Sequence, residues 1–354
     1  MTKRSRPTAR DDELITVVIP ARNESGHIGA TIQAVRRQTR SKLQIIVVDN
    51  ASTDRTPEIV RAHLDEDDRI DLLTNPEVSI PKSLNMALGA ARGRWFVRVD
   101  AHSTIPPDYV AKAIGRLEQG KWAGVGGRKD AVGTTPQGKA IAVALSSAFG
   151  VGNSVYHYGT ELQTVDHIPF GSYRTDLLKE IGGWDEELVA NEDYELDYRL
   201  RMAGHELLFD PDISIAWECR QSLLELWKQY RRYGKGKADV ADLHPESLAL
   251  RHLAAPALVA LWFVALLPGP AKRRRKLLAF GPYAAALALA TRKSKDSLSS
   301  DAAGYALPAA FAAMHISWGL GFWEQVIANK LDDRIRRDPS GNARNSGDVV
   351  SKSL

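Results

Sequence analysis

The chain has 354 residues, of which 44% are hydrophobic and 25% are charged, so it has room for a sizeable core in one large domain or two smaller ones. Its formal net charge is +4, but the basic clusters lack the interleaved aromatic residues of a nucleic-acid-binding surface, and we expect no nucleic-acid partner. Cys219 is the only cysteine, which excludes an intrachain disulfide.

The N-terminal part begins with a polar segment and continues into regular structure. Residues 1–13 lack the apolar stretch of a secretory signal, and we expect them to be a disordered lead-in. Residues 14–20 are a short β-branched apolar run, which is typical of a buried strand. Ile28, Ile32 and Val35 then recur at helical spacing, so a helix should follow this strand.

Strands and helices continue to alternate along the first hundred residues. Further strands are predicted at residues 43–48, 71–73 and 95–99, and further helices at residues 52–64 and 83–91. This alternation predicts an α/β fold of right-handed βαβ units, with a mostly parallel sheet between flanking helices. Because ligands bind at the carboxyl ends of such strands, Asn23, Asp49 and Asp100 are expected in one crevice.

The last third of the chain contains three apolar segments, at residues 253–267, 277–290 and 305–323. A helix that spans a bilayer needs about 20 apolar residues, so only the third segment is close to full length. The first two could form a hairpin, re-entrant helices or interfacial helices. Basic clusters at residues 272–276 and 292–295 border the segments, which favours contact with anionic membrane lipids. We therefore expect membrane-associated helices, and a soluble helical subdomain is the alternative.

The first candidate for chemistry is the run Asp100-Ala101-His102, which follows a predicted strand. Two side chains at this spacing can turn toward one ion. Carboxylate oxygen suits Mg²⁺ and Mn²⁺, while imidazole nitrogen favours Mn²⁺. We therefore expect a divalent cation here that could neutralise a diphosphate; the alternative is a strand end with two polar residues facing water.

Two other motifs follow predicted strands and carry candidate binding residues. Asn23 and Glu24 come after the first strand, where Asn23 could instead cap the next helix. Asp49 ends the second strand and could accept a hydrogen bond from a nucleobase or a ribose. Asp54, five residues later, is expected simply to cap a helix.

Two more motifs lie near predicted helices later in the chain. Asn191-Glu192-Asp193 precedes an amphipathic helix. Because adjacent carboxylates point in different directions, we expect at most one of the two to face the crevice, where it could be a general base for a hydroxyl nucleophile. The alternative is that these acids only complement the helix dipole. The segment at residues 229–237 combines Arg and Lys with glycines, which suits contacts with a diphosphate or with membrane lipids.

Taken in order, these motifs resemble family 2 of the inverting glycosyltransferases, which have the GT-A fold, over about residues 14–237. Pro20-Ala21-Arg22-Asn23-Glu24 is similar to the family pattern P-x-x-N-E, and Asp49-Asn50-Ala51-Ser52-Thr53-Asp54 is similar to D-D-G-S-x-D. Asp100-Ala101-His102 stands where the family has D-x-D, and Gly182-Gly183-Trp184-Asp185-Glu186 is similar to G-G-F-D-E. Glu192-Asp193 matches the E-D pair, and the segment from Gln229 to Tyr233 is a variant of Q-x-x-R-W. The V-D-A-H form, with apolar helices after it, most resembles the succinoglycan-type β-glucosyltransferases of exopolysaccharide assembly.

The resemblance implies a role for each matching residue. Asp193 would be the catalytic base of a single displacement that inverts the anomeric centre, and Asp49 would bind the uracil of a UDP-sugar. Asp100 and His102 would hold Mn²⁺ or Mg²⁺. The donor-binding residues would be Pro20, Asn23, Glu24, Asp49, Asp100, Gln229, Arg231, Arg232 and Lys235.

Three departures from the family pattern shape the predicted function. His102 stands where the family has an acid, which lowers the negative charge at the metal site and favours Mn²⁺ over Mg²⁺. Tyr233 stands where the family has Trp, and the three apolar segments are few for a polymer channel, so we expect addition of a single sugar. The predicted acceptor is a lipid-linked or other glycan. A catalytically weak sugar-nucleotide-binding scaffold is one alternative. A nucleotidyltransferase is another, but its Gly-rich phosphate loop is missing after the first strand.

The predicted organisation has four parts. Residues 1–13 are the lead-in, residues 14–245 the GT-A catalytic domain, residues 246–330 the membrane-associated helices, and residues 331–354 a polar tail. The expected location is the cell membrane, with the catalytic domain in the cytoplasm.

Overall fold

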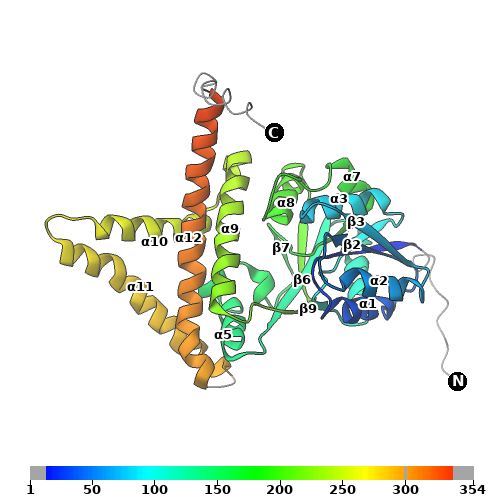
Figure 1. Cartoon of the computed structure of the whole chain (residues 1–354), viewed down its shortest axis with the longest axis horizontal. Helices are drawn as coiled ribbons and strands as arrows, with labels where there is room; N and C mark the ends of the chain where they lie inside the picture. Colours follow the sequence, from blue (N-terminus) through cyan, green and yellow to red (C-terminus); the bar gives the residue numbers. More distant parts are fainter. Residues whose placement is uncertain (1–12, 299–300, 338–354) are drawn as a thin grey trace, which may run out of the picture.

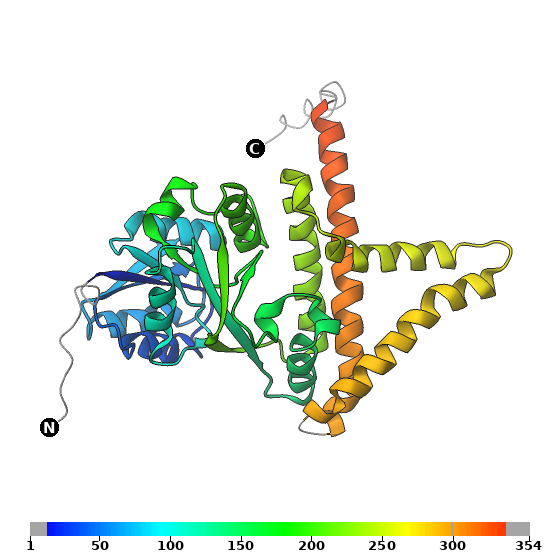
Figure 2. The same cartoon turned by 180° about the vertical axis from the view of Figure 1, so that it is seen from behind.

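A computed structural model describes residues 13–298 and 301–337 of the chain. Residues 1–12 of the expected lead-in and residues 338–354 of the expected tail lie outside the described residues. The α/β part and the C-terminal helices lie side by side (Figure 1), and the view from behind shows the same two parts (Figure 2). The division at residue 245 stays a prediction.

Four parallel strands form one half of the sheet, in the order β3-β2-β1-β4. They are β1 (Ile15–Ala21), β2 (Leu43–Asn50), β3 (Ile70–Asn75) and β4 (Trp95–Arg98). β2 is buried along its whole length, which its apolar, β-branched sequence explains. The βαβ units predicted from the sequence are therefore present in this half.

Helices cover both faces of these strands because alternate strand residues point to opposite sides. On one face, Val17 and Ile19 pack with α1 (Ile28–Arg36), α2 (Thr56–Leu64) and α4 (Tyr109–Leu117). On the other face, Val18 packs with α3 (Ile80–Ala90), α7 (Thr175–Glu180) and α8 (Glu192–Met202). The sheet is thus the middle layer of three.

The second half of the sheet is mixed, so the prediction of a mostly parallel sheet was wrong there. The order continues β8-β6-β9-β5, with β7 also on β9. β8 pairs antiparallel with β4 and β6, while β5 and β7 pair antiparallel with β9; β6 and β9 are parallel. Their bounds are β5 Ser103–Thr104, β6 Gly124–Val132, β7 Gln163–Val165, β8 Ser172–Arg174 and β9 Leu207–Glu218. Strands of two or three residues carry too little periodicity to be recognised.

The glycines of β6 have a packing reason. The register of β6 on β9 shifts between Gly127 and Arg128. A Cβ atom on Gly127 would lie 1.6 Å from the carbonyl oxygen of Ile213, so any other residue would push the two strands apart.

The C-terminal helices pack on each other beside the sheet. Among them are α9 (Leu223–Leu243) and α12 (Asp301–Arg337). Two helices from between β6 and β7, α5 (Pro136–Leu145) and the short α6 (Ala148–Val151), pack with them. The 3-10 turns are η2 (Val155–His157), η3 (Pro245–Ser247) and η4 (Lys295–Ser297). α9 and α12 run close together because Gly234 has no side chain: a Cβ atom there would lie 2.0 Å from the carbonyl oxygen of Trp318. Within α12, Leu307, Phe311 and Met314 are fully buried against this cluster.

The prediction that residues 305–323 nearly span a membrane is therefore not supported. The apolar side of this segment faces α5 and α9 instead of lipid. Among residues 13–298 and 301–337, no helix combines the length and the hydropathy that crossing a bilayer requires.

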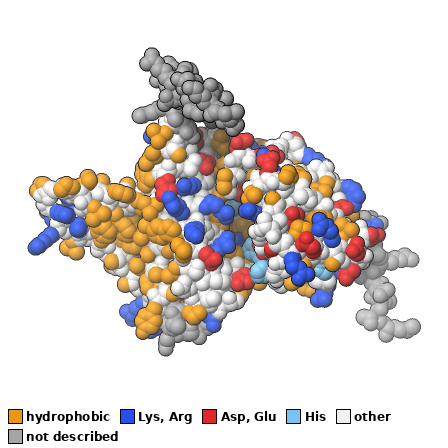
Figure 3. All heavy atoms as spheres, in the orientation of Figure 1, with side chains coloured by type: hydrophobic (Ala, Val, Ile, Leu, Met, Phe, Trp, Pro, Cys, Tyr) orange, Lys and Arg blue, Asp and Glu red, His pale blue; other side chains and the backbone are white. Residues whose placement is uncertain are grey.

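The two remaining helices, α10 (Leu250–Leu266) and α11 (Lys272–Ser294), form an arm that leaves the body of the protein and returns to it (Figure 1). Trp262 of α10 stacks on Phe280 of α11, with ring centroids 4.7 Å apart. Figure 3 shows hydrophobic side chains along this α10–α11 arm and basic side chains at its outer end. The exposed large apolar residues of the arm are Leu250, Leu253, Leu261, Phe263, Val264, Leu266, Leu267, Leu277, Leu278 and Leu289.

Candidate active site

The carboxyl ends of β1 and β4 open into a cavity of about 1470 Å³ that extends to the C-terminal helices. The residues that line it include Pro20 and Asn23 from the loop after β1, and also Leu258 of α10, Tyr283 of α11 and Trp318 of α12. The predicted site residues in the lining are Pro20, Asn23, Glu24, Asp100, His102, Asp193, Gln229 and Arg232. Segments far apart in the sequence therefore meet in one cavity, as the strand-end argument anticipated.

Three predicted donor-binding residues lie outside this lining. Asp49 is buried directly before the lining residue Asn50, and its Oδ1 atom has no hydrogen-bond partner among the described residues. Arg231 and Lys235 contact Glu324 of α12 instead, at 2.7 and 3.2 Å. These two cations therefore hold α9 against α12 and do not face the cavity.

The loop after β1 is shaped by contacts with the loop after β2. Asn23 has a left-handed backbone conformation with φ of 56°, and its Oδ1 atom accepts a hydrogen bond from the Thr53 amide at 2.8 Å. The Asn23 amide donates to Ser52 Oγ at 2.9 Å. Asn23 thus joins two loops and does not cap α1, which begins five residues later. Asp54 accepts a hydrogen bond from the Thr56 amide at 3.0 Å, but the N-cap position of α2 is Arg55, so Asp54 lies one residue before the position expected of a cap.

Asp100 and His102 offer part of a metal site. His102 Nδ1 lies 2.9 Å from Glu24 Oε1, which leaves Nε2 for another ligand. Burial alone would lower the pKa of His102, but Glu24 and Asp100 outweigh it and raise that pKa. No group of three metal-binding side chains occurs in the described part of the chain. Asp100 and His102 alone therefore do not make up a metal site, and most of the coordination of an ion would have to come from a bound ligand and water.

Arg98 is a site residue that the sequence interpretation missed. Its Nη1 atom donates to both carboxylate oxygens of Asp193, at 2.8 and 2.7 Å, and its Nε donates to Asp100 at 3.1 Å. Glu192 is 3.5 Å away, so both carboxylates of the Glu192–Asp193 pair face the same guanidinium. The expectation that at most one of them faces the crevice was wrong. A charged residue inside the apolar strand β4 was the available signal.

The electrostatics of this cluster follow from its burial. The Arg98 side chain is 5% exposed. Burial by itself lowers the pKa of Arg98, but Asp193, Asp100 and Glu192 outweigh it and raise that pKa above its ordinary value. Burial, and next the Asp193 charge, raise the pKa of Glu192. Arg98 therefore stays charged and holds Asp100 and Asp193 in a fixed relation to each other.

Three further hydrogen bonds fix the position of Asp193 and the chain around it. The Trp184 indole donates to Asp193 Oδ1 at 3.0 Å. Asn191, which has a left-handed φ of 65°, donates from Nδ2 to the Tyr233 carbonyl at 3.0 Å. Gln229 donates to the Tyr233 hydroxyl at 2.9 Å. The start of α8 is thus tied directly to α9.

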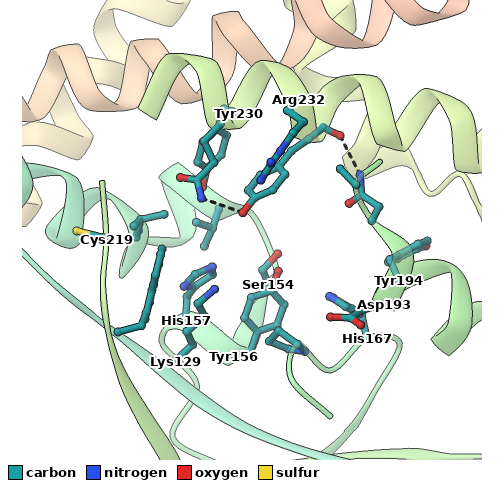
Figure 4. Close-up of a pocket in the computed structure, with 18 of the residues that line it drawn as sticks. Lys129, Ser154, Tyr156, His157, His167, Asp193, Tyr194, Cys219, Tyr230 and Arg232 are labelled. Atoms are coloured by element: carbon teal, nitrogen blue, oxygen red, sulfur yellow. Dashed lines mark hydrogen bonds between the residues drawn. The ribbon is translucent and has the colours of Figure 1, made fainter. Parts of the chain in front are cut away.

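Figure 4 shows side chains from both parts of the protein around the cavity, with Arg232 of α9 and Asp193 of α8 on different sides of it. Lys129 of β6 and the ring of His157 also lie there. Neither residue stood out in the sequence, because nothing in the pattern of residues 122–170 indicated which side chains face inward.

Comparison with known proteins identifies the family. The profile of a family described as Glycosyl transferase family 2 matches residues 16–181. The succinoglycan biosynthesis protein ExoA of Rhizobium meliloti (strain 1021) is 31% identical over 321 residues, which cover 88% of this chain and 94% of ExoA. The chain belongs to glycosyl transferase family 2. The resemblance inferred from the motifs is therefore confirmed, and the protein is a glycosyltransferase.

A second relative and a solved structure agree at the level of activity class and fold. The pre-mycofactocin glycosyltransferase of Mycobacterium tuberculosis (strain CDC 1551 / Oshkosh) is 27% identical over 261 residues, which cover 72% of this chain and 53% of that protein. The mannosyltransferase PcManGT from Pyrobaculum calidifontis, solved with GDP-Man and Mn²⁺, superposes with a TM-score of 0.54 at 21% identity, over 91% of this chain and 87% of the other. The likeness confirms the GT-A fold.

Proposed function

We propose that this family 2 glycosyltransferase moves a sugar from a UDP-sugar to a lipid-linked or other glycan acceptor, with inversion at the anomeric carbon. The observation that carries the proposal is the Arg98 cluster, in which Asp100 and Asp193 face one cavity. Asp49, to which the family resemblance assigns the uracil, lies outside the lining but directly before the lining residue Asn50, and its unpartnered Oδ1 atom would suit the N–H of a uracil only if the loop after β2 moved.

The proposed chemistry assigns one task to each carboxylate. Asp193 takes the proton from the acceptor hydroxyl while the oxygen of that hydroxyl attacks the anomeric carbon. The bond from that carbon to the diphosphate oxygen breaks in the same step. Arg98 and Trp184 hold Asp193 in place, which preorganises the base. No covalent sugar–enzyme bond is needed.

A divalent cation is part of the proposal. Asp100 and His102 would hold it, and when bound it supplies positive charge to the leaving diphosphate. PcManGT and GalNAc-T7, two proteins of similar fold, were solved with Mn²⁺. The imidazole ligand gives a further reason to expect Mn²⁺ to be preferred over Mg²⁺.

The acceptor is proposed to enter from the C-terminal helices. The cavity continues past Asp193 to Ala255 and Leu258 of α10 and to Tyr283 of α11. The outer parts of these helices carry the exposed apolar side chains of the α10–α11 arm. ExoA is named for succinoglycan biosynthesis, and by likeness to it we propose a role in polysaccharide biosynthesis.

We also propose that the α10–α11 arm lies in the inner leaflet of the cell membrane, with the catalytic domain in the cytoplasm. Exposed apolar side chains suit the acyl boundary, and the cluster Lys272-Arg273-Arg274-Arg275-Lys276 begins α11 at the outer end of the arm, where it suits anionic headgroups. The arm would thus attach to one leaflet instead of spanning both.

Donor turnover tests the proposed reaction. UDP-sugars and GDP-mannose are incubated with the full chain and Mn²⁺, and release of the nucleoside diphosphate is measured with and without membrane extracts as a source of acceptor. Release from a UDP-sugar is expected, with more release when acceptor is present. Absence of release with every donor would favour the scaffold alternative, and release from GDP-mannose alone would contradict the proposed donor.

Vesicle flotation tests the membrane proposal. The full chain should float with phosphatidylcholine–phosphatidylglycerol vesicles and less with pure phosphatidylcholine. Neutralising the five basic residues to Gln should abolish the difference between the two vesicles. Lys121→Gln, an exposed substitution in the sheet domain, serves as control. Failure of the wild-type chain to float with either vesicle would contradict the proposal.

A further inference from the structure

Lys129 occupies an unusual position in the cavity. Its ammonium nitrogen lies 3.9 Å from the ring centroid of Trp217 and 4.3 Å from that of Phe170. Among the ion pairs of residues 13–298 and 301–337 none involves Lys129, although the charges of Asp100 and Asp193 act on it at longer range. The two aromatic faces hold the side chain in place and leave its N–H groups without an anionic partner.

The surroundings of Lys129 locate it beside the metal motif. Trp217 contacts both Lys129 and the His102 ring, whose centroid is 6.4 Å from that of Trp217. Burial lowers the pKa of Lys129 to about 8, against the opposing effect of the Asp100 charge. Burial lowers the pKa of the nearby His157 to about 3, so that ring stays neutral.

The charges that line the cavity divide into paired and unpaired groups. Asp100, Asp193 and Glu192 share Arg98, and Glu24 is matched by His102. Lys129, Arg220 and Arg232 also line the cavity, and none of these three makes an ion pair within the described part of the chain. The lining as a whole carries as many acidic as basic residues, but these three cations are not engaged by a carboxylate of the described residues and can contact a multiply charged anion.

We propose that Lys129 binds the diphosphate of the nucleotide-sugar donor and stabilises the nucleoside diphosphate as it leaves. This inference rests on the proposed function and adds a binding residue to it. His102 gives the metal motif one carboxylate fewer than the family pattern, and Lys129 supplies a fixed cation at the same place. An ammonium that already lies free of carboxylates can contact a phosphate oxygen without first breaking an ion pair.

The test measures UDP and uridine binding to the full chain by calorimetry, without any acceptor. Lys129→Met should weaken UDP binding at least about tenfold, as expected for loss of a charge-assisted hydrogen bond, and leave uridine binding unchanged. Lys129→Arg should retain most of the UDP affinity. Lys121→Met is the matched control, because Lys121 lies over the Trp122 ring at 4.2 Å outside the cavity; it should change neither affinity.

Each contrary result has a distinct meaning. Equal UDP affinity of wild type and Lys129→Met would overturn the inference and leave the proposed function intact. Parallel loss of uridine and UDP binding would make Lys129 a structural residue and also overturn it. A loss of activity in Lys129→Met that appears only as a higher KM for the acceptor, with UDP binding intact, would assign Lys129 to the acceptor. If the wild-type chain binds neither UDP nor GDP, that result would contradict both the proposed nucleotide-sugar donor and the proposed role of Lys129.

Discussion

The sheet domain buries charged side chains that are usually exposed, whereas the α10–α11 arm exposes apolar side chains that are usually buried. The sheet domain buries charges, with Arg98 at 5% exposure among three carboxylates. The arm exposes apolar groups, such as Leu278 at 63% and Phe263 at 64%. Buried charges and contiguous exposed apolar surface are the informative exceptions in a globular protein, because both reduce stability unless something compensates. We interpret the first as catalytic machinery and the second as a binding surface.

Substitution of the proposed base, Asp193, is expected to have the largest effect on the catalytic role assigned to the buried charges. Asp193→Asn keeps the shape and the Trp184 contact but cannot accept a proton from a hydroxyl. We expect sugar transfer to fall roughly 10²–10⁴-fold, the usual contribution of a general base. UDP affinity, measured by calorimetry, should change little. Transfer at the wild-type rate would exclude Asp193 from this role.

Arg98→Met tests whether the buried charges depend on one cation. Removing Arg98 leaves Asp193, Asp100 and Glu192 together without a counter-charge, so we expect unfolding in urea to require about 3–5 kcal/mol less free energy. Arg128→Met is the control, since Arg128 pairs with Asp130 near the surface and should contribute under about 1 kcal/mol. Similar losses in both variants would show that the cluster has no special role.

A pair of leucines compares the two regions directly. Leu84 of α3 is fully buried, whereas Leu278 of α11 is 63% exposed. Leu84→Ala should lower the unfolding free energy by about 2–5 kcal/mol, and Leu278→Ala should change it by less than about 0.5 kcal/mol. Leu278→Ala should instead reduce flotation with anionic vesicles. A strong destabilisation by Leu278→Ala would mean that the arm is covered by protein.

Lys237→Met is expected to stabilise the protein, by an amount that depends on pH. Burial lowers the pKa of Lys237 to about 7 from an ordinary value of 10.5. Between these pH values the unfolded chain therefore binds more protons at this residue than the folded chain does. The free energy of unfolding of the wild type consequently rises with pH over this range. The variant should therefore melt a few degrees higher than wild type below about pH 7, and the difference should vanish above about pH 10.5. Lys228→Met, an exposed change on the same helix, should give no pH-dependent difference.

Much of the site could be predicted from strand ends and motif order. Asn23 and Asp100 line one cavity, as the alternation of strands and helices anticipated, whereas Asp49, which was expected with them, lies outside the lining. Arg231 and Lys235 were expected beside Arg232, but a helix turns about 100° per residue, so neighbours face different ways. Glu324, which pairs with both, comes from a helix 90 residues later in the chain, and no local pattern indicates that contact.

The nature of residues 305–323 also required the tertiary structure. A buried core helix and a membrane helix have similar composition, and length alone separates them poorly. Gly234 and Gly321 allow α9 and α12 to approach closely, and this approach covers Phe311 and Met314 with protein. The arm, with comparable composition, finds no such partner among the described residues and stays exposed.

By itself the sequence determined the family, the βαβ half of the sheet and the residues at its strand ends, because local periodicity and short motifs carry that information. Only the tertiary structure decided which charges pair. Arg98 meets Asp193, 95 residues away, and Lys129 is held between two aromatic rings from other segments. Such partners depend on how separate elements pack, and packing is a property of the whole folded chain.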